Sequence, residues 1–266
     1  MPFLSQGGLS LRYDRAGAGP AVLLIHGWNG NRTFWTRQVQ ALRDHHTVIT
    51  VDLRGHGESS RPRTGYSVAS LATDLEQLVR ALRVPHIAVV GWSLGGMVAL
   101  ELARKLGERA SALALVCTTP GALTDPKNPN AVPPERVAEM RAGIQADSRD
   151  FIRGFAPGLF KDGAASPLLP WAISEMVKTP SHVVEACFEA IAAFDVRKWL
   201  KDLKVPTMVL HGRHDALLAF AGGEVLQKTI PKAKLTAFEN SGHSPFLEET
   251  DAFNTVLTKF LSPSKK

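Results

Sequence analysis

Apolar residues along this chain gather in short runs that alternate with longer amphipathic stretches. The short runs predict buried strands, and the amphipathic stretches predict helices. Such an alternation is typical of a mostly parallel sheet with helices on both faces, here preceded by a strand hairpin at Gly8–Asp14. The strands on which the argument depends are predicted at Ala21–Ile25, Ile87–Val90, Leu113–Cys117, residues 205–212 and Leu235–Phe238.

The alternation stops at Pro120, where a proline-rich loop begins and strand signals become few. We therefore expect residues 1–119 and 200–266 to form one core, and residues 120–199 to form a helical cap inserted in it. The helices expected in the cap are Pro134–Gln145, Ser148–Phe155, Leu168–Lys178 and Ser181–Phe194. The core pattern then resumes and closes with a helix at Asp251–Leu261.

The stretch Gly91-Trp92-Ser93-Leu94-Gly95 lies between a predicted strand and a helix predicted at Met97–Ala103. In that context the G-x-S-x-G pattern is typical of a sharp turn that exposes a serine hydroxyl. The glycines have no side chain to collide across so tight a turn, and the start of a helix favours negative charge nearby. We expect Ser93 to be a nucleophile; the alternative is a structural serine in a turn.

A serine at such a turn is followed along the chain by its acid and then by its histidine. Asp215 follows the predicted strand 205–212, and His243 follows the strand Leu235–Phe238. Catalytic groups collect at the carboxyl edge of a parallel sheet, where both residues are expected. We expect Asp215 to orient the ring of His243, and His243 to take the proton of Ser93.

Four other side chains compete for these two roles. Asp125 follows a candidate strand but lies well into the proline-rich segment, and Glu239 lies one turn before the expected base. His211 and His214 precede the expected acid, which is the wrong order along the chain.

His26-Gly27-Trp28 follows the strand Ala21–Ile25. Backbone N–H groups aimed at a developing oxyanion stabilise the transition state of acyl transfer, and we expect them from Leu94 and Trp28. His26 is expected to brace this loop rather than carry protons. The Trp28 side chain has two equal interpretations, a pocket wall or a packing residue.

A cap would roof the serine and form an apolar pocket for the substrate. Apolar side chains in a cap also form its own core, so about half of the candidates are expected to line the pocket. The candidates are Trp28, Trp92, Phe151, Phe155, Phe160, Leu168, Trp171, Phe188 and Phe246.

Together these motifs make the chain resemble the α/β-hydrolase fold superfamily along nearly its whole length. Val51-Asp52-Leu53-Arg54-Gly55-His56-Gly57-Glu58-Ser59 resembles the D-x-R-G-x-G-x-S loop of that superfamily, in which Asp52 and Arg54 are expected to be structural. The motifs around His26, Ser93 and His243 are similar to those of pimeloyl-carrier-protein methyl ester carboxylesterases and 3-oxoadipate enol-lactonases. The resemblance implies an α/β-hydrolase fold with an inserted cap.

The residues and the resemblance together predict a serine carboxylic ester hydrolase acting on a small to medium ester through an acyl-enzyme. Enol-lactonase activity and a carrier-protein-bound methyl ester substrate remain open, since these enzymes use the same triad. A cofactor-free perhydrolase ranks lower, because members of that group often carry proline where this chain has Asn29-Gly30. A small-ligand receptor on the same fold is the non-enzymatic alternative.

Composition is that of an ordinary globular protein, with 44% hydrophobic and 21% charged residues among 266. No signal peptide and no membrane-length apolar run is evident, and the two cysteines, Cys117 and Cys187, are expected to be packed thiols. We therefore expect a cytoplasmic protein.

The net charge of +6 is not accompanied by a nucleic-acid-binding module, and no ligand spacing for a metal or loop for a cofactor phosphate is found. We therefore expect no metal, no cofactor and no nucleic-acid partner. Basic residues in the cap are expected to be a solvated helix face; the alternative is a docking surface for an acidic carrier protein. They are Arg136, Arg141, Arg149, Arg153 and Lys161.

Overall fold

The computed structural model of the protein describes residues 2–6, 8–121, 125 and 131–262. Within these residues eight strands form one sheet, in the order β1-β2-β4-β3-β5-β6-β7-β8. β2 is antiparallel to β1 and β4, and the other neighbours are parallel, so the expected mostly parallel sheet is confirmed. The strands are β1 (Phe3–Gln6), β2 (Leu9–Ala16), β3 (Ala21–Ile25), β4 (Thr47–Val51), β5 (Ile87–Trp92), β6 (Ala110–Val116), β7 (Thr207–Gly212) and β8 (Lys234–Phe238).

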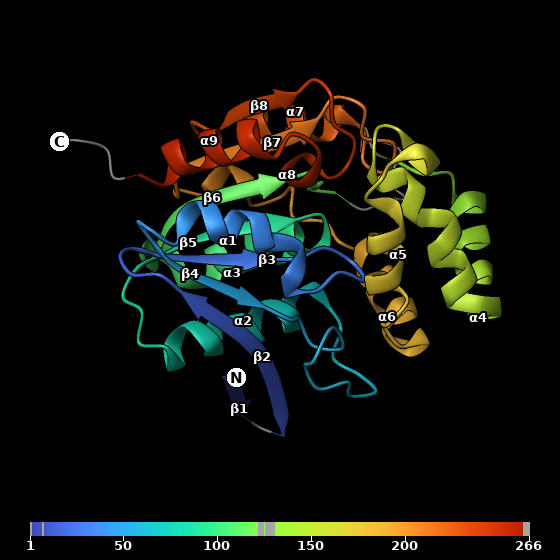
Figure 1. Cartoon of the computed structure of the whole chain (residues 1–266), viewed down its shortest axis with the longest axis horizontal. Coiled ribbons are helices and arrows are strands. Elements are labelled where there is room, and N and C mark those ends of the chain that lie inside the picture. Colours follow the sequence, from blue (N-terminus) through green and yellow to red (C-terminus); the bar gives the residue numbers. More distant parts are fainter. Residues whose placement is uncertain (1, 7, 122–124, 126–130, 263–266) are drawn as a thin grey trace.

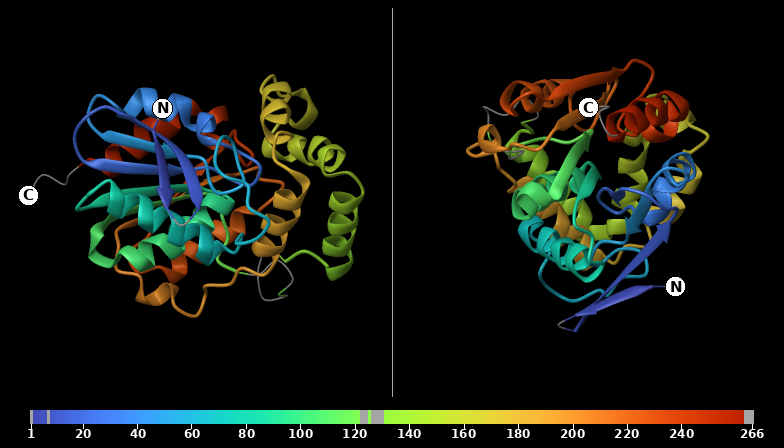
Figure 2. Two further views of the ribbon diagram at one scale, coloured as in Figure 1. Left: turned by 90° about the horizontal axis from the view of Figure 1, so that it is seen from below. Right: turned by 90° about the vertical axis from the view of Figure 1, so that its left-hand side faces the viewer.

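Helices cover both faces of the sheet. α1 and α9 pack together on one face, and α2 and α3 pack together on the other (Figure 2). None of the helices in the described ranges combines the length and the apolar character needed to cross a bilayer. The helices are α1 (Thr36–Leu42), α2 (Val68–Ala81), α3 (Leu94–Leu106), α4 (Pro134–Phe155), α5 (Leu169–Met176), α6 (Ser181–Ala192), α7 (Phe220–Thr229), α8 (Pro245–Glu248) and α9 (Thr250–Leu261).

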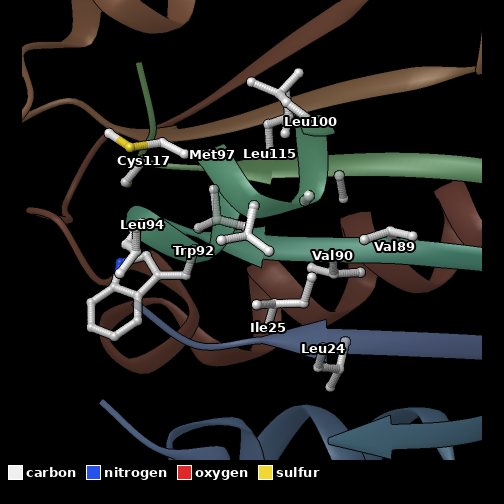
Figure 3. Packing of buried hydrophobic residues seen from close by; sticks show 14 of the residues in the cluster. Leu24, Ile25, Val89, Val90, Trp92, Leu94, Met97, Leu100, Leu115 and Cys117 are labelled. Atoms are coloured by element: carbon white, nitrogen blue, oxygen red, sulfur yellow. The ribbon is translucent and has the colours of Figure 1, made fainter. Parts of the chain in front are cut away.

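Strand β5 lies in the middle of the sheet and is buried along its whole length. It pairs with β3 on one side and with β6 on the other. Figure 3 shows Val89 and Val90 in the apolar packing that includes Ile25 of β3 and Leu115 of β6. A strand with helices on both faces is a nearly continuous apolar run, which explains why the sequence predicts it. This rigid centre carries the turn that contains Ser93.

The N-terminal hairpin begins earlier than predicted. β1 pairs with the first half of β2, and Gly8 in the turn between them has a φ of +79°, which glycine adopts without steric cost. The predicted hairpin at Gly8–Asp14 is therefore the turn and the second strand of a longer hairpin.

Helices α4, α5 and α6 lie beyond the carboxyl ends of the parallel strands, outside the two layers that cover the sheet (Figure 1). α4 is broken at Asp147, whose φ of −155° and ψ of 101° are not helical. The Asp147 carboxylate accepts hydrogen bonds from the backbone N–H groups of Arg149 and Asp150 and so caps the second half. The two predicted helices are thus both present, and they meet at a kink at Asp147. The cap boundaries at residues 120 and 199 stay predictions.

Candidate active site

Ser93 occupies the turn between β5 and α3. Its φ of 55° and ψ of −119° are sparsely populated for a residue with a side chain, so the turn is strained. Its N–H donates to the Val116 carbonyl at 2.9 Å, and its carbonyl accepts from the Thr118 hydroxyl at 2.9 Å. Neighbouring strand ends therefore hold the strained backbone, and the Ser93 side chain is left half-buried.

The turn packs tightly against the end of β3. A Cβ on Gly95 would lie 2.4 Å from the carbonyl oxygens of both Ile25 and His26. A Cβ on Gly91 would lie 2.1 Å from the carbonyl oxygen of Gly95. Both separations are far below a van der Waals contact, and the obstructing atoms are backbone atoms that cannot move independently. The close packing around Ser93 therefore requires glycine at these two positions.

Replacing Gly95 with alanine is expected to lower the free energy of unfolding by about 3 kcal/mol, because β3 and the turn must separate. Gly154 in α4 is a matched control, because a Cβ there has no atom within 4 Å. Gly154→Ala is expected to raise stability by about 0.5 kcal/mol through helix propensity. Urea unfolding of the two variants measures both effects. Equal stabilities would contradict the tight packing of the turn.

Asp215 lies just after β7, with its side chain held on both oxygens. Oδ1 accepts from the backbone N–H groups of Leu217 and Leu218, both at 2.9 Å, and Oδ2 accepts from His243 Nδ1 at 2.7 Å. Burial opposes the charge of Asp215, but the field of His243 and the hydrogen bonds from His211 and His243 outweigh it. The pKa of Asp215 therefore lies well below its ordinary value, and the side chain is a carboxylate.

His243 lies on the loop between β8 and α8. The loop is fixed by α8 and by Trp92: Glu248 accepts from the Gly242 N–H at 2.9 Å, and the Trp92 indole donates to the His243 carbonyl at 2.8 Å. Because Asp215 is ionised, the Nδ1 atom of His243 carries the proton that joins them. Nε2 then keeps a free lone pair. A general base requires such a lone pair to accept a proton.

Two buried histidines brace the loop after β3. His26 Nε2 accepts from the Leu53 N–H at 3.0 Å, and His56 Nε2 accepts from the Asn29 N–H at 3.3 Å. Each ring donates through Nδ1 to a backbone carbonyl, that of Gly27 and that of Arg54. Burial lowers the pKa of His26 to about 4 and, together with the neighbouring His26, that of His56 to about 3. Both rings are neutral and fully used by the backbone, which is the bracing role expected for His26.

Asp52 and Arg54 hold the loop that carries His56. The buried Asp52 carboxylate accepts from the Arg32 backbone and guanidinium, each at 2.7 Å. The Arg54 guanidinium pairs with Asp74 at 2.6 Å. These contacts join loops of the core, in line with the structural roles expected for both residues.

The two expected oxyanion donors come from the residue after Ser93 and from the loop after β3. Leu94 is the first residue of α3, and the first N–H groups of a helix have no partner within the helix. Trp28 lies in the loop after β3, and its indole donates to the Val184 carbonyl of α6 at 3.1 Å. The Trp28 side chain therefore packs against α6, and it also lines a cavity together with Ser93. The oxyanion role of the two N–H groups stays a prediction.

A cavity of about 280 Å³ lies over Ser93 and His243. Its wall comes from the core, from α4 and α6 of the cap and from the loop that follows Asp215. Among the described lining residues, Arg136 adds the one charged side chain to a wall that is otherwise mostly apolar. The lining residues are Trp28, Trp92, Ser93, Met97, Val132, Arg136, Met140, Phe155, Leu159, Phe188, Ile191, Ala216, Leu217, Leu218 and His243.

Of the nine side chains expected to line the pocket, the structure brings four to this cavity: Trp28, Trp92, Phe155 and Phe188. The other five side chains contact different parts of the core or of the cap. Phe246 contacts Trp35 and Trp92, and Trp171 contacts Phe34. Phe151 lines a groove along α4, Phe160 is buried beside Gly242, and Leu168 packs against the core.

The sequence analysis missed most of the aliphatic wall. Met140 follows Arg136 by one turn of α4, and Ile191 follows Phe188 on α6. This spacing was the available signal, because residues three or four apart share a helix face. It shows which residues share a face, but not that the face looks onto Ser93.

The competing acids have other partners. Asp125 contacts Arg197, and Glu239 pairs with Arg213 at 2.9 Å on the surface. His214 is exposed. His211 is buried and lies against Asp215, a contact that the sequence analysis did not predict.

Cys117 and Cys187 are both buried free thiols, as expected. The ligand atoms of Cys117, Asp215 and His243 lie within 4.8 Å of one another, which is a possible donor set for a metal ion. However, burial and the Asp215 charge raise the pKa of the Cys117 thiol, and a proton already joins the other two side chains. A protonated thiol and a shared proton make this set of side chains a poor metal ligand set.

Ion pairs occupy part of the basic cap surface. Arg136 pairs with Glu139 at 2.8 Å, and Arg141 pairs with Glu189 at 2.6 Å. Lys161 donates to Asn240, whereas Arg149 and Arg153 are exposed. These pairs favour the solvated helix face, and docking of a carrier protein stays a prediction.

Known proteins resemble this chain along nearly its whole length. The sequence model described as alpha/beta hydrolase fold matches residues 20–250. The pimeloyl-[acyl-carrier protein] methyl ester esterase of Vibrio atlanticus is 29% identical, over 94% of this chain and 98% of its own.

Two solved structures are similar along their whole length. An esterase from Exiguobacterium antarcticum superposes with a TM-score of 0.92 and is 28% identical, over 98% of this chain and 99% of its own. The enol-lactonase from Burkholderia xenovorans superposes with a TM-score of 0.88 and is 25% identical, over 98% of this chain and 100% of its own. The family match, the sheet order and the serine turn lead to one conclusion: the chain belongs to the α/β-hydrolase fold family.

Proposed function

We propose that the protein is a serine carboxylic ester hydrolase with Ser93 as nucleophile, His243 as general base and Asp215 as the acid. The observation that carries the proposal is the 2.7 Å hydrogen bond from His243 Nδ1 to Asp215 Oδ2, beside a cavity that His243 and Ser93 line together. The esterases among the similar proteins support the same reaction class.

The proposed reaction has two halves. His243 Nε2 takes the Ser93 proton as Oγ attacks the ester carbonyl carbon, and the N–H groups of Leu94 and Trp28 stabilise the oxyanion. The tetrahedral intermediate collapses, and the alcohol leaves with the proton held by His243. Water then attacks the acyl-enzyme, His243 takes a proton from it, and Ser93 is released with a carboxylic acid as product.

The cavity favours a small to medium ester. Its volume of about 280 Å³ is roughly twice that of an apolar cavity of about 150 Å³ that binds benzene. Because its wall is mostly apolar, it suits an uncharged acyl chain. Methionines at positions 97 and 140 have flexible side chains that fit chains of different shape.

Hydrolysis of a lactone is a second candidate, favoured by the likeness to the Burkholderia enol-lactonase. A lactone is an internal ester, so the same nucleophile and base would open it. The leaving alcohol then stays attached to the acyl group. Only the shape of the pocket separates the two substrate classes.

The test is a panel of 4-nitrophenyl esters of increasing acyl length together with simple lactones. We expect turnover that depends on Ser93. The rate should be highest for short or medium acyl chains and should fall for long chains that exceed the cavity. A preference for lactones over every ester would favour the second candidate. Absence of turnover on all of these substrates would contradict both candidates.

A further inference from the structure

Asp215 contacts two histidines through one oxygen. His243 Nδ1 lies 2.7 Å from Oδ2, and His211 Nε2 lies 3.2 Å from the same atom. Both rings are buried, and His211 is on β7, four residues before the acid. We propose that His211 is a positioning residue of the acid–base pair, which orients Asp215 and takes up part of the charge that Asp215 presents to His243. This inference rests on the proposed function.

The surroundings of His211 determine where its proton lies. Nε2 faces two acceptors, the Leu218 carbonyl at 2.8 Å and Asp215 Oδ2 at 3.2 Å, so Nε2 carries the proton. Its N–H donates to the Leu218 carbonyl and lies against Asp215 Oδ2. Nδ1 is buried and has no hydrogen-bond partner among the described residues. A second proton there would be a buried charge without an acceptor. His211 is therefore neutral, with the tautomer opposite to that of His26, His56 and His243.

Packing keeps the His211 ring in this orientation. On one side it faces Gly223 of α7, where a Cβ would lie 2.9 Å from Nδ1. The edge of Phe220 in the same helix meets the ring at a centroid distance of 5.6 Å. The ring is fully buried, so it has no room to turn its proton away from Asp215.

The shared oxygen has a consequence for the base. Oδ1 of Asp215 is already bound by two backbone N–H groups, so its other stabilising contacts converge on Oδ2. The partial positive charge of the His211 N–H, 3.2 Å from Oδ2, leaves less negative charge to hold the proton of a protonated His243. Without this donor, His243 would hold its proton more tightly, and the active, deprotonated base would form only at higher pH.

Other titratable groups surround the pair and stay unchanged in the variants proposed below. The Cys117 thiol faces Asp215 from the end of β6 and is held neutral by burial. Glu248 of α8 is bound to the backbone of Lys161 and Gly242, and Arg213 lies over Phe220. The remaining groups near this loop are His214, Glu224 and Glu239.

The experiment measures kcat/KM against pH for the best ester in the wild type, His211→Leu, His211→Gln and His214→Gln. In His211→Leu, which lacks a donor, the acidic limb is expected to move up by about 0.5 to 1 pH unit, with a plateau about tenfold lower. His211→Gln keeps an N–H donor and is expected to restore the limb. The exposed His214 is the matched control, whose variant should follow the wild type. An acidic limb in His211→Leu that coincides with the wild type overturns the inference.

A second measurement needs no folded leucine variant. ¹⁵N-histidine NMR of the wild type is expected to show a buried ring with the proton on Nε2 whose signals vanish in His211→Gln. A proton on Nδ1 of His211, or a charged ring at neutral pH, would overturn the inference.

The ester assays with Ser93→Ala separate the two proposals. Turnover that does not need Ser93 refutes the proposed function, whereas Ser93-dependent turnover with an unmoved acidic limb refutes the role of His211 alone.

Discussion

Replacing Ser93 with alanine is expected to lower kcat/KM for ester hydrolysis by about 10⁵-fold, leaving only the slow attack of water. Ser93 alone would supply the oxygen that forms the acyl-enzyme, whereas His243 and Asp215 act on its proton. The strained backbone at φ 55° exists whether the side chain is serine or alanine, so the variant is expected to fold. Initial rates with a 4-nitrophenyl ester and a urea unfolding curve measure the two effects.

Ser93→Gly is the matched control for strain. Glycine also lacks the hydroxyl but adopts a positive φ without steric cost, so this variant is expected to be as inactive as Ser93→Ala. Substantial activity in either variant, beyond what a mock purification contains, would show that another residue attacks the ester. If both variants lose the folded state as well as activity, the expectation of an intact fold is contradicted. The function of the hydroxyl is then not demonstrated.

The strand ends were predictable because they obey local rules. Asp215 and His243 each follow a buried apolar run, and neighbouring parallel strands end at the same edge of a sheet. The register of β7 with β8 brings the two loops side by side, and their side chains meet at 2.7 Å. Local pattern and chain order were sufficient here, since the separation is set by the sheet and not by details of packing.

The pocket wall was less predictable because an apolar residue gives no sign of the surface it faces. Phe246 and Trp171 have the same character as Phe155 and Phe188, yet the first two pack against aromatic residues of the core. Which side of a helix faces the nucleophile depends on how the cap helices cross the sheet edge. That arrangement is a tertiary property and leaves no period in the sequence.

His211 illustrates a different limit. Chain order directs attention away from it as a general base, since it precedes the acid. The same rule gives no information about a second histidine that contacts the acid. That contact depends on the turn after β7, in which the backbone bends so that Asp215 accepts from the N–H groups of Leu217 and Leu218 and returns toward the strand.

Replacing Asp215 with asparagine is expected to lower kcat by about 10⁴-fold. The backbone N–H groups of Leu217 and Leu218 require an acceptor, so the amide oxygen takes the Oδ1 position and the amide NH₂ faces the histidines. His243 Nδ1 then meets a donor and gives up its proton, which moves to Nε2. A ring with its proton on Nε2 cannot accept the proton of Ser93. Steady-state kinetics on the same ester measure the loss.

Two matched controls separate this effect from a general loss of negative charge. Asp125 contacts Arg197 and Glu239 pairs with Arg213, so Asp125→Asn and Glu239→Gln each remove one carboxylate that has an arginine partner. Both variants are expected to stay within about threefold of the wild type, because exposed or half-exposed pairs contribute little. A large loss in Asp125→Asn with a small one in Asp215→Asn would instead assign the acid role to Asp125. An isosteric amide changes which atoms carry protons but keeps the packing. Comparison of Asp215→Asn with the two controls therefore tests whether the loss of activity comes from the tautomer of His243.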